Sequence, residues 1–145
     1  MLNTTQTLAS GITYKPFGPV SAMTLGNSVT LSKTYDLNYQ LGGLTYAGVL
    51  ERTYSPDNEG NVTAITDTLD PTRSQSFGYD DLYRLTSASG IYGAITYTYD
   101  NVGNRLSRTE NNDEDTYYYY PGTNLLNIVA GKHPEQILYD SDGNT

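Results

Sequence analysis

The stretch I-T-Y-T-Y-D-N-V-G-N-R-L-S-R, which runs from Ile95 to Arg108, decides the fold of this chain. In its first half Tyr97 and Tyr99 alternate with threonines, and such alternation indicates a β-strand with two unlike faces. Asp100 and Gly103 then take the first and fourth positions of a turn. Asp can accept hydrogen bonds from the free amides of the turn, and Gly tolerates the positive φ that re-entry into a strand requires. The stretch therefore predicts a complete β-hairpin.

The same turn signal recurs along the chain at a nearly constant period. Successive occurrences lie 20 to 23 residues apart and begin at Lys15, Asp36, Asp57, Asp80, Asp100, Tyr120 and Asp140. Periods of this size are typical of repeat arrays. No segment shows a sustained apolar period of 3.6 residues, so the sequence predicts about a dozen short strands and no long helix.

The turns vary in ways that predict their geometry. Asp57 and Asp140 keep a Gly three residues later, whereas Lys15 is followed by Pro, which suits the same turn. Tyr120 is followed by Pro and then Gly, which predicts a type II turn. The turns at Asp36 and Asp80 carry a Tyr in place of the Gly. A bulky residue at positive φ is costly, so we expect those two turns to differ in geometry.

Three segments carry a family resemblance: Tyr79–Leu85, Tyr99–Leu106 and Tyr139–Asn144. Each resembles the tyrosine-aspartate (YD) repeat of the bacterial Rhs family, which is similar to repeats in Tc toxin shells and teneurins. The resemblance implies an all-β fold of tandem hairpins that form one continuous twisted antiparallel sheet, a partial spiral of a hollow β-shell. It also identifies the structural repeat motif as Tyr35, Asp36, Asp57, Gly60, Tyr79, Asp80, Tyr99, Asp100, Gly103, Tyr139, Asp140 and Gly143.

Composition excludes several classes of partner. The chain has 145 residues, a formal net charge of −8 and only 17% charged residues, so it offers few cations for nucleic acid or an anionic membrane. It contains no Cys and therefore no disulfide or thiolate metal site. No apolar run approaches the length that spans a bilayer, and the first residues do not have the pattern of a signal peptide.

The residues that might carry chemistry have plainer interpretations. The repeated Asp residues are expected to cap turns rather than form a catalytic pair. Asp140 and Asp142 resemble the opening of a calcium loop but lack the further ligands, so they remain weak metal candidates. His133, the single histidine, is interpreted as a surface-loop residue. The acidic run 110–115 is expected to be a solvated turn.

The run Tyr117–Tyr120 places two Tyr on each face of a strand. Packing within the array is the favoured interpretation, and a sugar-stacking platform stays open.

These observations favour a structural function. We expect a flexible entry at residues 1–11 and one repeat array of about six hairpins at 12–145, truncated at its C-terminus. The resemblance implies a non-catalytic wall segment, without cofactors, of a secreted or cell-surface bacterial protein. Its partners would be other repeats of the parent shell or an enclosed toxin domain. The alternatives are a carbohydrate- or cell-surface-binding module that uses exposed Tyr, and self-association through open edge strands.

Overall fold

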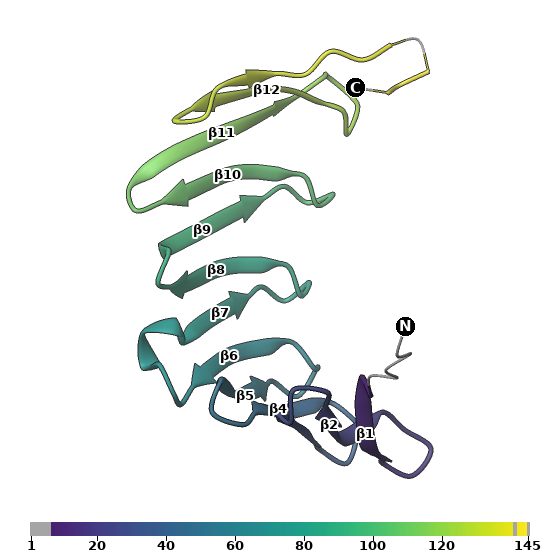
Figure 1. The fold of residues 1–145 in the computed structure, drawn as a ribbon. Coiled ribbons are helices and arrows are strands. Elements are labelled where there is room, and N and C mark those ends of the chain that lie inside the picture. Colours follow the sequence, from purple (N-terminus) through teal and green to yellow (C-terminus); the bar gives the residue numbers. More distant parts are fainter. Residues whose placement is uncertain (1–6, 141, 145) are drawn as a thin grey trace, which may run out of the picture. The chain divides into compact units, whose positions relative to one another are not determined.

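The computed structural model describes residues 7–140 and 142–144, which form short β-strands joined by turns (Figure 1). The strands are β1 (Ala9–Tyr14), β2 (Val20–Leu25), β3 (Thr30–Tyr35), β4 (Leu41–Tyr46), β5 (Leu50–Pro56), β6 (Val62–Asp67), β7 (Gln75–Tyr79), β8 (Leu85–Gly90), β9 (Gly93–Tyr99), β10 (Arg105–Glu110), β11 (Asp113–Tyr119), β12 (Leu126–Gly131) and β13 (Glu135–Gln136). A 3-10 helix, η1 (Pro71–Arg73), lies between β6 and β7. Within the described residues no helix has the length and apolar character needed to cross a bilayer.

The strands occur in the sheet in the same order as in the chain, from β1 to β13. Each described strand pair is antiparallel, as β9 and β10 illustrate. The predicted all-β fold of tandem hairpins in one continuous antiparallel sheet is therefore confirmed. The chain forms two compact units, Met1–Ser76 and Phe77–Thr145. The expected entry segment 1–11 lies partly outside the described residues, and its described part contains the start of β1.

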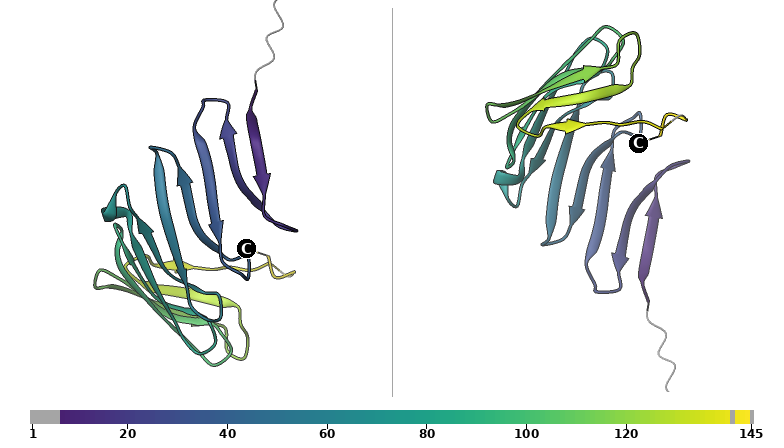
Figure 2. Two further views of the ribbon diagram at one scale, coloured as in Figure 1. Left: turned by 90° about the horizontal axis from the view of Figure 1, so that it is seen from below. Right: turned by 90° about the horizontal axis from the view of Figure 1, so that it is seen from above.

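In the first unit, strands β1 to β6 lie side by side (Figure 2). The side chains on the two faces of this sheet differ. The cross-strand pairs on one face are large, such as Leu31 with Tyr46. The pairs on the other face are small and hydroxylated, such as Thr53 with Thr66. Leu31 is only 4% exposed, because long side chains of neighbouring strands cover one another.

The second unit repeats this division of faces. We call one side the tyrosine face, which carries Ile95, Tyr97, Tyr99, Arg105, Arg108, Tyr117 and Val129. The other side, the hydroxyl face, carries Ser87, Thr96, Thr98, Ser107, Thr109 and Thr116. The buried apolar residues Ala88, Tyr117 and Val129 belong to the tyrosine face, so the core of this single-layer unit lies on that side.

A β-bulge recurs in the hairpins. In β9 and β10, Thr98 pairs with Ser107 and Tyr99 pairs with Arg105, which leaves Leu106 unpaired. The corresponding unpaired residues in other hairpins are Ser21, Gly42, Thr63 and Asn127. A bulge shifts the alternation of side chains by one residue, so Arg105 and Arg108 project from the same face.

One sequence-based prediction is wrong for the turns at the strand ends opposite to the Asp turns. The acidic run expected to be a solvated turn belongs largely to β10 and β11, and only Asn111 and Asn112 form the loop. Both have positive φ, 49° and 80°, which Asn tolerates and which a two-residue type I′ hairpin requires. The last strand of the sheet, β13, comprises only Glu135–Gln136.

Candidate functional site: the repeat turns and the tyrosine face

The repeated Asp side chain closes its own turn. In the turn that begins at Asp100, Oδ1 accepts hydrogen bonds from the amides of Val102 at 3.0 Å and Asn104 at 2.8 Å. Oδ2 accepts from Nδ2 of Asn104 at 2.9 Å. Amides two and four residues further on bind Oδ1 in the same way at Asp36, Asp57, Asp80 and Asp140. Each carboxylate is therefore engaged by its own turn.

These hydrogen bonds favour the ionised carboxylate. The side-chain amide of Asn61 is the largest cause of the lowered pKa of Asp57. At Asp100 the largest influence is desolvation, which opposes ionisation, but the hydrogen bonds from Asn104 and the turn amides outweigh it and lower the pKa. The backbone amide four residues on is the main cause of the lowered pKa of Asp80 and Asp140. Ionised side chains of this kind are poor proton donors at neutral pH.

The fourth turn residue has a positive φ whether or not it is Gly. The φ angle is 97° at Gly103, 61° at Tyr39 and 60° at Tyr83. The amide of Tyr83 donates to the carbonyl of Asp80 at 2.9 Å, as that of Gly103 does to Asp100 at 3.2 Å. The prediction that the two Tyr turns differ in geometry is therefore wrong. The hydrogen bonds to the Asp carboxylate hold the turn closed and offset the strain of a Tyr at positive φ.

Two turns without Asp have another geometry. Gly122, the third residue of the turn that begins at Tyr120, has a φ of 73°, which confirms the predicted type II turn. In the turn that begins at Lys15, the third residue Phe17 has a φ of 56°. The prediction that the Lys15 turn matches the Asp turns is therefore wrong. Without an Asp cap, the Pro at its second position favours a turn with positive φ at the third residue.

The repeat tyrosines join one hairpin to the preceding one. The hydroxyl of Tyr99 donates to the carbonyl oxygen of Leu85 at 2.8 Å, and that of Tyr119 donates to Arg105 at 2.9 Å. Tyr35 donates in the same way to Val20 at 3.1 Å. Burial raises the pKa of Tyr99 and Tyr119, so both hydroxyls keep their protons. The sequence analysis missed this link, although the constant position of Tyr before the turn was a signal for it.

The remaining motif tyrosines occupy corresponding positions. Tyr79 is the last residue of β7. The ring of Tyr139 packs edge-to-face on that of Tyr120, with their centroids 6.2 Å apart. In the four-tyrosine run Tyr117 is buried on the tyrosine face, whereas Tyr118 is 53% exposed on the opposite face.

Arginines stack on this aromatic array. The Cζ atom of Arg84 lies 4.7 Å from the ring centroid of Tyr99, and one terminal nitrogen donates to the carbonyl of Asp100 at 2.7 Å. The Cζ atom of Arg105 lies 4.2 Å from Tyr117 and 5.8 Å from Tyr97. Stacking of a guanidinium on a tyrosine ring is attractive, so these residues stabilise contacts between neighbouring strands.

Two buried carboxylates lie near the strand ends that are opposite to the Asp turns. Asp67 and Asp115 are each 2% exposed, and each lies directly opposite an Arg on the neighbouring strand. Nε of Arg52 is 3.2 Å from Asp67, and a terminal nitrogen of Arg108 is 3.7 Å from Asp115. The backbone amide of His133 also donates to Asp115 at 2.7 Å. His133 does lie in a loop, but that loop is anchored to a buried charge.

The weak metal candidates are placed in the last described turn. Asp140 uses its Oδ1 for the amides of Asp142 and Asn144, at 2.9 Å each. Among residues 7–140 and 142–144, no group of three or more His, Asp or Glu side chains converges as metal ligands would.

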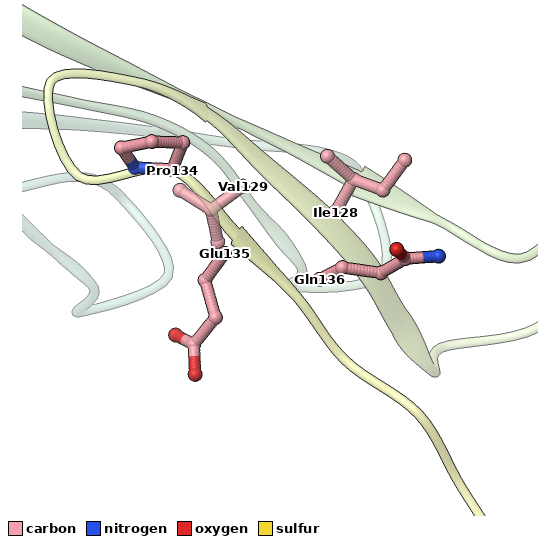
Figure 3. A pocket seen from close by; sticks show the side chains of 5 residues that line it. All are labelled: Ile128, Val129, Pro134, Glu135 and Gln136. Atoms are coloured by element: carbon pink, nitrogen blue, oxygen red, sulfur yellow. The ribbon is translucent and has the colours of Figure 1, made fainter.

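A shallow hollow adjoins β13 (Figure 3). It is lined by Ile128, Val129, Pro134, Glu135 and Gln136. Ile128 pairs with Gln136 and Val129 pairs with Glu135, so the two pairs belong to opposite faces of the sheet. The hollow therefore lies against the last two strands and takes residues from both faces of the sheet, so it is not an enclosed site on one face.

Comparison with known proteins identifies the fold. No protein-family model and no curated protein matches the chain. The crystal structure of TcdB2-TccC3-Cdc42 matches it with a TM-score of 0.74 and 20% identity, over 87% of this chain and 8% of that one. The Photorhabdus luminescens Tc holotoxin pore matches with a TM-score of 0.73 and 22% identity, over 83% of this chain and 8% of that one. The chain thus has the Rhs/YD-repeat fold of a Tc toxin shell and spans a small part of its neighbours' length.

Proposed function

We propose that this chain is a non-catalytic wall segment of an Rhs/YD-repeat shell that encloses or presents a toxin or effector polypeptide. The observation that carries the proposal is the tyrosine link from one hairpin to the one before it, which Tyr35, Tyr99 and Tyr119 each make. The Asp side chains close the turns, and the Tyr side chains connect the repeats. Residues used in this way build a continuous sheet rather than a site for chemistry.

Protease protection tests this function. The native gene product is isolated with an antibody against this segment and treated with protease at increasing urea. A wall segment predicts an associated polypeptide that resists cleavage until the wall opens. It also predicts earlier cleavage when Tyr99→Phe and Tyr119→Phe are combined. Cleavage at the same rate with and without urea, in both proteins, would contradict enclosure. The proposed location, secreted or at the cell surface, is tested by fractionating the producing bacterium.

A second candidate is a carbohydrate-binding module. Tyr118 favours it, because this residue is 53% exposed and lies opposite Ile128 on the neighbouring strand. Exposed aromatic rings can pack against the apolar faces of sugars. A glycan array with the wild type and Tyr118→Ala distinguishes the two candidates. Binding that is lost in the variant favours the carbohydrate module, and the absence of binding favours the wall segment.

A further inference from the structure

Arg105 differs from the other four arginines of the chain. Each of the others pairs with a carboxylate: Arg52 with Asp67, Arg73 with Asp70, Arg84 with Asp80, and Arg108 with Glu110 and Asp115. Among the described residues, the guanidinium of Arg105 has neither an ion pair nor a hydrogen bond. Its Nε is screened from water and has no acceptor. An unpaired buried donor of this kind costs free energy, and none of the described carboxylates neutralises the charge of Arg105.

The surroundings of Arg105 hold its charge in place without neutralising it. The guanidinium is stacked 4.2 Å from the centroid of Tyr117 and lies 5.8 Å from that of Tyr97. The carbonyl oxygen of Arg105 accepts the hydroxyl of Tyr119, which fixes the backbone. Because the side chain is already ordered, a ligand that binds it avoids much of the usual entropic cost.

The charge pattern indicates what kind of ligand fits. One guanidinium matches one planar carboxylate, which it can bind through two nitrogens. The chain's net charge of −8 disfavours polyanions such as nucleic acids or heparin-like glycans. Elsewhere on the same face, Arg108 is already paired with the protein carboxylates Glu110 and Asp115. An Asp or Glu side chain is thus the partner that this face uses.

We propose that Arg105 is a docking point for the acidic side chain of a polypeptide that lies against the tyrosine face of the second unit. The site does not depend on the chain being part of a shell. The carboxylate approaches the terminal nitrogens of Arg105, while Tyr97 and Tyr117 hold the guanidinium between their rings. The occupant is a partner polypeptide that presents an Asp or Glu side chain to this face.

NMR of the arginine Nε–Hε groups tests the site directly. Protein labelled with ¹⁵N-arginine is titrated with N-acetylglutamate α-amide, which carries a single side-chain carboxylate. N-acetylglutamine α-amide is the uncharged match, and a glucuronate methyl glycoside represents anionic sugars. We expect the Arg105 signal, assigned with Arg105→Met, to move with the glutamate probe and not with the glutamine probe. Arg105→Lys should bind roughly tenfold more weakly, because hydrogen bonds to a charged group contribute about that factor.

Arg73→Met is the matched control, because Arg73 is an exposed arginine that is already paired with Asp70. This variant should leave the movement of the Arg105 signal unchanged. No movement of that signal, or equal movement with glutamine, overturns the site. Movement with glucuronate but not with glutamate overturns the polypeptide partner. If Arg105→Met does not fold, Arg105→Lys, which also removes the arginine signal, supplies the assignment, and the wild-type comparison of glutamate with glutamine decides the outcome.

Discussion

Asp115 and His133 form a hydrogen bond in which an exposed imidazole covers a buried carboxylate. Nδ1 of His133 lies 2.8 Å from Oδ2 of Asp115, and the two side chains are 62% and 3% exposed. His133 lies 18 residues further along the chain, in the turn between β12 and β13. One side chain of β11 therefore anchors the turn between β12 and β13.

This anchor should be sensitive to acid. The side chain of His133 is the main cause of the lowered pKa of Asp115. A carboxylate with a lowered folded-state pKa stabilises the fold above its unfolded pKa of about 3.9. That stabilisation is lost as the pH falls through the lower folded-state value. We expect Asp115→Asn to lower the urea midpoint at neutral pH by a clear margin and to flatten its decline in acid.

Asp113→Asn is the control for this prediction. Asp113 lies on the same strand, but its side chain is 55% exposed where it meets Lys132. Exposed ion pairs contribute little, so this variant should keep the wild-type pH profile. Profiles of Asp115→Asn and the wild type that coincide from neutral pH into acid would show that the anchor does not contribute.

The link between repeats predicts a cost for removing one hydroxyl. Tyr99→Phe deletes the donor to the carbonyl of Leu85 and keeps the ring. We expect the free energy of unfolding to fall by about 1–3 kcal/mol, because a part-buried carbonyl loses its partner. Tyr118→Phe, at an exposed position, should change it by less than about 0.5 kcal/mol. Urea melts of both variants measure the difference. Equal midpoints would mean that the hydroxyl link adds nothing to stability.

The equivalent turn positions Gly103 and Tyr83 predict effects of opposite sign. Gly103→Val places a β-branched residue at a φ of 97° and should cost about 1–3 kcal/mol. Tyr83→Gly relieves a left-handed Tyr that is 60% exposed, so it should be neutral or stabilising by up to about 1 kcal/mol. Thermal melts of the two variants check this. A loss of stability in Tyr83→Gly as large as that in Gly103→Val would mean that the Tyr ring, not the backbone, determines that turn.

The hairpin array could be predicted because its signals are local. Asp100 and Gly103 are three residues apart, and the turn that they specify recurs every 20 to 23 residues. The burial of Asp115 could not be predicted, because it depends on Arg108 on one side and on His133 18 residues later. The acidic run therefore looked solvated.

The link from Tyr99 to Leu85 was missed for a related reason. It joins neighbouring repeats, and its distance of 14 residues matches neither the strand period nor the turn spacing. The positive φ of Tyr83 also depended on an energetic balance. The cost of a Tyr at positive φ could be predicted from the sequence. The hydrogen bonds to Asp80 that offset this cost form only once the turn is closed.

The last prediction concerns association through the two edges of the sheet, which differ. β1 contains a register shift between Ser10 and Thr13, with Gly11 at a φ of 60°. Such a bulge interrupts the row of backbone groups that a new strand would need. β13 pairs with β12 without a shift, and its outer side is the other edge of the sheet. We therefore expect the β13 edge to pair with another chain.

A twofold-symmetric dimer through β13 should form, because two copies of one edge related by a twofold axis pair antiparallel, as all described strands do. The amide of Ile137 donates inward to Asn127 at 2.9 Å, so the amides of Gln136 and Leu138 point outward. Leu138→Pro removes an outward donor without breaking an internal bond and should shift the dimer to monomer in light scattering over a concentration series. Ile137→Pro is the contrasting variant, since it breaks the bond to Asn127 and should also lower stability. A wild type that remains monomeric at every concentration, or a Leu138→Pro dimer as tight as the wild type, would show that this edge does not pair.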